Sequence, residues 1–94
     1  MMEKNTEKYL FGLMNQILKN GMYITHIEEP YMIIEAADET EARKIYCNVH
    51  DAVSHDTAEL IAKKSGTIWW KITKYLRHEQ IASIIGKLEE NISI

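Results

Sequence analysis

Apolar residues recur at spacings of three and four along residues 6–20, which predicts an amphipathic helix over that segment. Asn5 or Thr6 can cap its start, and Gly21 can end it. Gly12 lies inside the segment and costs a helix about 1 kcal/mol relative to Ala, so this helix is expected to depend on packing. The apolar stripe consists of Tyr9, Leu10, Leu13, Met14, Ile17 and Leu18.

The pattern changes at residues 22–36 to β-branched and aromatic residues, which are typical of strands. The turn-forming sequence Glu28-Glu29-Pro30 divides this segment, so a β-hairpin is predicted over residues 22–36. Asp38, followed three residues later by Glu41, has the form of a capping box and predicts that a helix begins there.

The second half of the chain is expected to be helical, although one segment is ambiguous. Asp56 or Thr57 can cap a short helix over residues 58–65, which Gly66 would end. The next segment, TIWWKITKYL, fits a helix with Ile72 on its inner side, but it also fits a strand with strong β propensity. We take the helix, because a short helix and a Gly precede it. Apolar spacing predicts a last helix over residues 79–92.

These elements predict a mainly helical α+β fold in a single domain spanning residues 1–94. The N-terminal helix (6–20) and the β-hairpin (22–36) would precede a three-helix helix-turn-helix bundle (39–77) and the C-terminal helix (79–92). The two strongly apolar end helices offer more apolar surface than one small core needs. A homodimer is therefore expected.

Composition is that of an ordinary globular protein, with 46% hydrophobic and 27% charged residues among 94. The formal charge of −3 argues against a protein that coats nucleic acid indiscriminately. The charges are segregated, however. Residues 60–78 hold five basic residues and no acid, which leaves 6 basic and 14 acidic residues elsewhere.

The same basic segment resembles the helix-turn-helix of bacterial and phage repressors over residues 58–77. Ile61 and Ala62 stand where that family packs its first helix on its second, and Gly66 stands at the turn between them. Ile72, with Tyr75 or Leu76, stands where the second helix is buried. The resemblance to the lac type of repressor is carried by the sequences IAKKSG and ITKYL.

The resemblance implies a small sequence-specific DNA-binding protein, a dimeric transcriptional repressor of the phage or mobile-element kind. Basic side chains would contact phosphates of double-stranded DNA, and exposed residues of the second helix would approach base edges. The alternative is that the basic segment is only a solvent-exposed helical face that happens to lack acidic residues. The expected DNA-binding residues are Lys63, Lys64, Trp69, Trp70, Lys71, Thr73, Lys74 and Arg77.

A second hypothesis is an inhibitory protein that docks on a protein target, as phage anti-defence proteins such as anti-CRISPRs do. Its acidic body could also mimic nucleic acid and compete for a basic channel. Adjacent tryptophans suit a protein interface. The docking surface would consist of Glu28, Glu29, Glu35, Asp38, Glu39, Glu41, Trp69 and Trp70.

Catalytic and metal chemistry have little support in the sequence. The spacing of Cys47, His50 and His55 suits a buried Cys and partly exposed His residues better than a zinc site. The chain has no phosphate loop or nucleophile motif, so we expect neither an enzyme nor a cofactor. The N-terminal sequence MMEKNTEK does not read as a signal peptide, and no apolar run is long enough to cross a membrane, so a cytoplasmic protein is expected.

Overall fold

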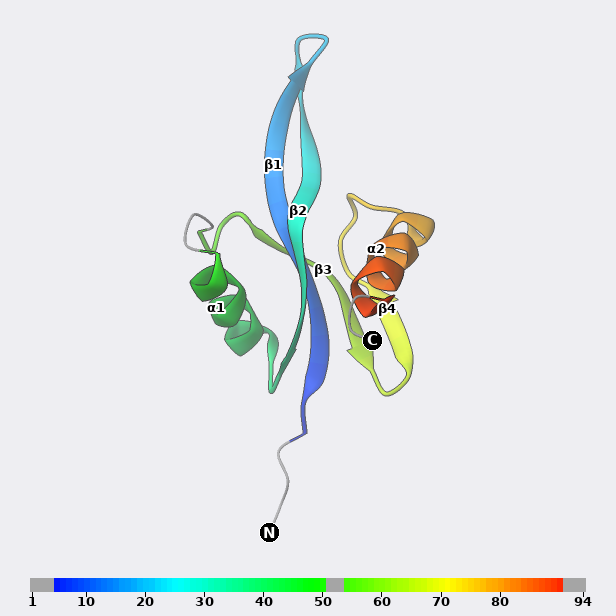
Figure 1. Ribbon diagram of the computed structural model, residues 1–94. Helices are drawn as coiled ribbons and strands as arrows, with labels where there is room; N and C mark the ends of the chain where they lie inside the picture. The colour runs from blue at the N-terminus through cyan, green and yellow to red at the C-terminus, as the bar shows by residue number, and fades with distance from the viewer. Residues whose placement is uncertain (1–4, 51–53, 91–94) are drawn as a thin grey trace.

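The computed structural model describes residues 5–50 and 54–90 and contains four strands and two helices in these ranges. Their order is β1 (Glu7–Lys19), β2 (Met22–Ala36), α1 (Glu39–Val49), β3 (Ala58–Ser65), β4 (Ile68–Lys71) and α2 (His78–Glu90). The strands form one antiparallel sheet in the order β2-β1-β3-β4. The two helices lie on opposite sides of it (Figure 1).

The sheet has two apolar faces because successive residues of a strand point to opposite sides. Tyr9 and Phe11 of β1 pack with Tyr46 of α1, and the Phe11 and Tyr46 rings stack at a centroid distance of 5.4 Å. Leu10, between them in the sequence, packs on the other face with Ile81 of α2. Because both faces of β1 are covered, the strand does not show the alternation of apolar and polar residues that is typical of a sheet with one face in solvent. The apolar spacings of three and four that predict a helix arise here by coincidence.

The predicted helix over residues 6–20 is wrong, because these residues form β1. Asn20 and Gly21 have φ values of 53° and 78°, which is the backbone of a two-residue hairpin turn that joins β1 directly to β2. The predicted hairpin over residues 22–36 is also wrong. Its two halves form the single strand β2, and the pairing with β1 is irregular around residues 29–31, opposite Gly12.

The mainly helical fold and the three-helix bundle over residues 39–77 are contradicted as well. Residues 58–65 form β3 and residues 68–71 form β4, so the segment that resembles a helix-turn-helix is a β-hairpin. Gly66, with a φ of 64°, occupies the turn of this hairpin rather than the end of a helix. In TIWWKITKYL, Ile68, Trp69 and Trp70 follow their β propensity.

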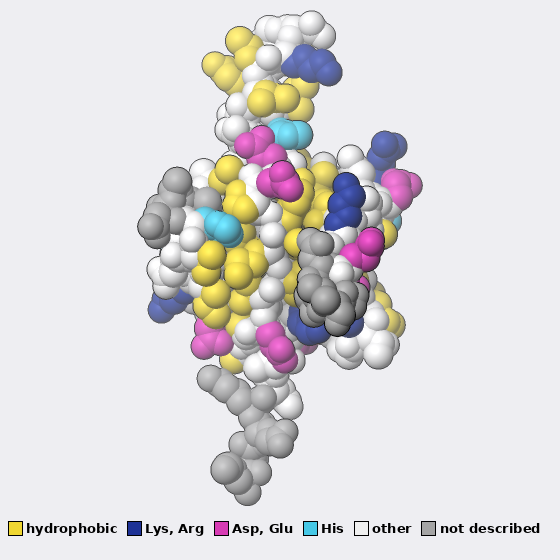
Figure 2. All heavy atoms as spheres, viewed as in Figure 1, with side chains coloured by type: hydrophobic (Ala, Val, Ile, Leu, Met, Phe, Trp, Pro, Cys, Tyr) yellow, Lys and Arg dark blue, Asp and Glu magenta, His cyan; other side chains and the backbone are white. Residues whose placement is uncertain are grey.

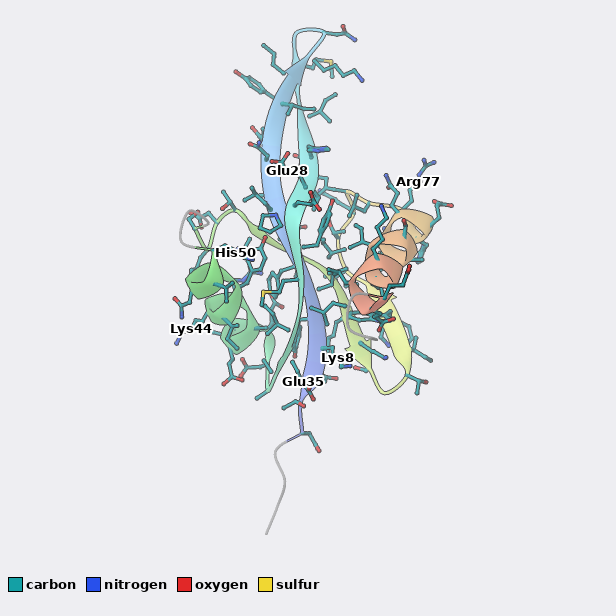
Figure 3. All side chains as sticks on the ribbon, viewed as in Figure 1. Lys8, Glu28, Glu35, Lys44, His50 and Arg77 are labelled. Carbon is teal, nitrogen blue, oxygen red and sulfur yellow. The ribbon has the colours of Figure 1, made fainter. Side chains whose placement is uncertain are left out.

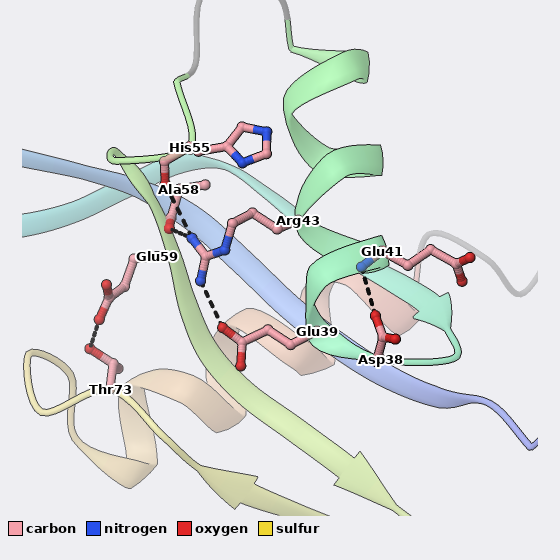
Figure 4. A network of polar contacts seen from close by, with 8 residues as sticks. All are labelled: Asp38, Glu39, Glu41, Arg43, His55, Ala58, Glu59 and Thr73. Atoms are coloured by element: carbon pink, nitrogen blue, oxygen red, sulfur yellow. Dashed lines mark hydrogen bonds and ion pairs between the residues drawn. The ribbon is translucent and has the colours of Figure 1, made fainter.

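Two predicted helices are present. Asp38 caps α1 by accepting a 2.8 Å hydrogen bond from the Glu41 backbone N–H (Figure 4). The Glu41 carboxylate accepts a hydrogen bond of 3.0 Å from the Ala37 N–H. The C-terminal helix is α2, which ends at Glu90. Residues 91 and 92 of the predicted helix lie outside the described residues.

Candidate docking surface

The β1–β2 hairpin extends well beyond the sheet that the helices cover. We call residues 15–26 the arm; it projects past both helices in Figure 1 and makes the molecule 57 Å long and 26 Å wide. Met14 marks its root, because its N–H donates a 2.7 Å hydrogen bond to the Thr57 carbonyl and its side chain packs against the α2 side of the core.

The arm exposes large apolar side chains on both faces. Cross-strand partners share a face, so Leu18 lies beside Tyr23 on one face and Ile17 beside Ile24 on the other. Leu18 is 64% exposed and Tyr23 is 72% exposed. Figure 2 shows hydrophobic side chains gathered on the arm above the body. The exposed apolar residues of the arm are Ile17, Leu18, Met22, Tyr23 and Ile24.

The arm carries little charge. Within residues 15–26 there is one Lys, Lys19, and no acid; the remaining polar residues are mostly amides and hydroxyls. Acidic residues begin at the root of the arm, where Glu28 lies 3.6 Å from the imidazole of His26 (Figure 3). The exposed surface of the arm is therefore mainly apolar and almost uncharged.

A groove continues from the root of the arm along the body, between β2 and α2. Its two adjoining parts have volumes of about 630 and 500 Å³, and Tyr31 and Ile84 line both. Lys87 and Glu29 stand along the first part. The Tyr31 hydroxyl donates a 3.2 Å hydrogen bond to the Ile27 carbonyl, which holds the floor of this groove in place.

The structure does not bring the expected DNA-binding residues into one row. Lys63 and Trp70 are cross-strand partners on the α1 side of the β3–β4 hairpin. Lys64, Trp69 and Lys71 lie on the α2 side, where the Lys64 ammonium stands 6.0 Å from the Trp69 ring.

The other three expected DNA-binding residues also have internal partners. Thr73 is buried, with 3% of its surface exposed, and its hydroxyl donates a 2.8 Å hydrogen bond to Glu59 (Figure 4). The Lys74 ammonium lies 5.5 Å from the Tyr75 ring, and the exposed Arg77 pairs with Glu79 at 3.6 Å. Only a surface side chain can touch DNA, so Thr73 drops out of that role.

Lys63 belongs to a polar cluster at the end of the sheet opposite the arm. Its ammonium lies 3.1 Å from the Glu7 carboxylate, which also accepts a 2.5 Å hydrogen bond from the Ser65 hydroxyl. The Ser65 hydrogen bond, with that of Lys63, holds the pKa of Glu7 below its usual value, and Glu7 in turn raises the pKa of Lys63. The side chains of Glu7, Lys63 and Ser65 therefore use one another as hydrogen-bonding and ionic partners.

The acidic residues of the expected docking surface do not lie together, and several of them make contacts that stabilise the fold. Asp38 and Glu41 cap α1 as described, while Glu39 pairs with Arg43 at 2.8 Å. Arg43 also donates to the Ala58 carbonyl, which ties α1 to β3 (Figure 4). Glu35 accepts a 2.7 Å hydrogen bond from Thr6 at the end of the sheet opposite the arm, far from Glu28 in Figure 3.

The three candidate metal ligands do not converge. Cys47 is half-buried against the core, and the ring of His50 packs edge-on to that of Tyr46 at 4.9 Å. His55 uses its backbone carbonyl to accept from Arg43 at 3.3 Å. Among residues 5–50 and 54–90, no three His, Cys, Asp or Glu side chains are grouped as metal ligands. The same residues include no helix long and apolar enough to cross a membrane.

Sequence reasoning missed the arm, although the signal for it is present. Asn-Gly between two apolar runs is the strongest short-range indication of a two-residue hairpin, and Asn20-Gly21 has that form.

Comparisons of the chain with protein-family models, with curated proteins and with solved structures find no significant match.

Proposed function

We propose that this protein is a docking protein, and that it inserts its arm into an apolar cleft of a protein partner. The observation that supports this is the exposure of Ile17, Leu18, Met22, Tyr23 and Ile24 on a two-stranded arm beyond the body. A soluble two-stranded ribbon gains nothing from apolar residues on both faces unless something covers them.

The apolar surface of the arm is large enough to define a specific interaction. From the exposed fractions, its five side chains offer roughly 500 Å² of accessible apolar surface, divided between the two faces of the arm, so a partner that covers both faces would bury all of it. Tyr23 is the natural anchor, since aromatic residues dominate the binding energy of protein interfaces. The groove beside Tyr31 and Ile84 extends the surface onto the body.

A protein partner suits this surface better than DNA does. One lysine in the arm can neutralise about one phosphate, which gives a log–log salt slope near −1 and little affinity. The expected DNA-binding residues are divided between two faces and one is buried, which withdraws the support that a recognition helix gave to the DNA hypothesis.

Site-specific photo-cross-linking tests the proposal. A photoreactive phenylalanine analogue replaces Tyr23 in one variant and Lys44, an exposed residue of α1 remote from the arm, in a control (Figure 3). In cells that naturally make the protein, position 23 is expected to trap one protein saturably, and purified trapped protein should bind the wild-type chain directly. Equal trapping from both positions, or trapping of nucleic acid at position 23, would contradict the proposal.

A further inference from the structure

A second exposed apolar surface lies on β4 and on the residue that follows it, Ile72, at the opposite edge of the sheet from β2. Ile68, Trp70 and Ile72 alternate with residues that face α2, so they point to the α1 side. Each is more than half exposed, with Trp70 at 56%. The helix α1 packs on β1, β2 and β3, which leaves these three side chains, which we call the edge stripe, outside its cover.

The backbone of β4 also presents unpaired groups along its outer edge, because β4 is the last strand of the described sheet. The Ile72 N–H donates a 2.9 Å hydrogen bond inward to the Ile61 carbonyl of β3. Backbone groups alternate in direction along a strand, so those of Trp69 and Lys71 point outward. An outward row of this kind pairs readily with another strand.

We infer that a second copy of this chain occupies the edge, with the two β4 strands antiparallel about a two-fold axis at Trp70. In that register Trp69 of each copy exchanges backbone hydrogen bonds with Lys71 of the other. Trp70 then lies opposite Trp70 of the second copy, and Ile68 opposite Ile72. The edge stripe becomes a continuous apolar strip across the dimer.

Self-complementarity is what favours a second copy over an unrelated strand. Two identical edges meet with apolar residues opposite apolar ones on the α1 side. On the α2 side Lys71 of each copy lies opposite Trp69 of the other, a pairing that allows a cation–π contact. The other edge of the sheet, β2, carries Glu28, Glu29 and Pro30 midway, residues that discourage strand pairing.

The size of the contact places it among small, weakly associating interfaces. The edge stripe offers roughly 300–400 Å² per copy, so the interface reaches about 1,000 Å² in total only when the backbone and lysine stems are included, the lower limit for a specific dimer. A dimer with a Kd of about 1–100 µM is expected on that basis. Lys64, Lys71 and Lys74 of the two copies repel one another, so added salt should tighten the dimer, opposite to its effect on DNA binding.

Analytical ultracentrifugation from 5 to 500 µM, a range of about two decades around that Kd, measures the association. Trp70→Ser is expected to weaken it at least about tenfold. The paired arm variant Leu18→Ser/Tyr23→Ser should leave it unchanged. Circular dichroism confirms folding of both variants. A wild-type monomer throughout the range, or dissociation by the arm variant and not by Trp70→Ser, would overturn the inference. Because the arm and the edge stripe are separate surfaces, a monomeric wild type leaves the docking proposal to its own test, whereas dissociation by the arm variant would make the arm itself the site of self-association.

Cysteine pairing tests the register. In a Cys47→Ser background, an oxidised mixture of Ile68→Cys and Ile72→Cys chains should form the mixed disulfide in preference to either homodimer, since these two positions lie opposite each other. Homodimeric disulfides forming as fast as the mixed one would contradict the axis at Trp70.

Discussion

The hydroxyl of Tyr46 donates a 2.6 Å hydrogen bond to the carbonyl of Pro30, and so joins the middle of α1 to the irregular part of β2. Tyr46 is fully buried, and its ring stacks on Phe11 of β1. One side chain thus connects the helix to both strands of the hairpin just below the arm. The contact therefore fixes the hairpin to the body of the molecule next to the root of the arm.

Replacing Tyr46 by Phe is therefore expected to destabilise the fold by about 1–2 kcal/mol, because the Pro30 carbonyl loses its donor in a buried site while the ring is kept. Tyr23→Phe is the matched control, since that hydroxyl is on an exposed ring of the arm. Urea unfolding measures both free energies. Equal values for the two variants would show that the hydrogen bond contributes nothing to stability.

The same tyrosine gives the fold a pH dependence at high pH. Burial raises the pKa of Tyr46 from the usual 10.0 to about 12. The contribution of Tyr46 to the free energy of unfolding is thus fully present below pH 10. It declines as pH rises through the interval to about 12, since the Tyr46 hydroxyl ionises in the unfolded chain before it does so in the folded one. The difference in unfolding free energy between the wild type and Tyr46→Phe should narrow over that interval. A constant difference would contradict the raised pKa.

Gly12 is expected to tolerate no side chain. A Cβ placed there would lie 2.9 Å from Ile61 Cδ1 and 3.0 Å from Ile27 Cγ2, in the core on the α2 side of the sheet. Gly12→Ala should cost about 1–3 kcal/mol by overpacking. Gly86→Ala, in an open position inside α2, should stabilise by about 0.5–1 kcal/mol through helix propensity. Thermal unfolding compares the two, and a harmless Gly12→Ala would contradict the close packing.

Thr73 is expected to act in folding rather than in binding. Thr73→Val keeps the shape but removes the 2.8 Å hydrogen bond to Glu59, at a cost of about 1–2 kcal/mol. Thr40→Val, at an exposed position of α1, serves as the control and should change stability by less than about 0.5 kcal/mol. Chemical denaturation distinguishes the variants. An unchanged stability for Thr73→Val would show that the hydrogen bond to Glu59 contributes nothing to the fold.

The parts of the fold that sequence reasoning predicted correctly are those with local determinants. The cap of α1 depends on Asp38 and Glu41, which lie three residues apart, and α2 shows its apolar spacing without interruption. The errors over residues 6–20 and 58–65 concern β1 and β3, two strands with buried residues on both faces. Tyr9, Leu10 and Phe11 are all fully buried because a helix lies on each side of β1, and a continuous apolar run of this kind does not distinguish strand from helix.

The candidate site was missed for a related reason. Ile17 and Leu18 completed an apparent helical stripe, so their exposure could not be foreseen without knowing that Asn20-Gly21 forms a hairpin turn. The tryptophans were identified from sequence, but the assignment of Trp69 to the α2 side and of Trp70 to solvent depends on β4 being a strand. In both cases the exposure follows from the pairing of two strands in a hairpin, which the spacing of apolar residues alone does not show.

The most direct measurement of the central claim is the affinity of the arm for its partner. Calorimetric titration of the cross-linked partner, once purified, compares the wild type with Leu18→Ser/Tyr23→Ser and with Lys44→Ser, a change on α1 outside the arm. The account predicts that the arm variant remains folded yet binds at least about 30-fold more weakly, since an aromatic anchor and its neighbour contribute about 2 kcal/mol or more, while Lys44→Ser binds as the wild type does. Undiminished binding by the folded arm variant would contradict the claim that the arm is the docking surface.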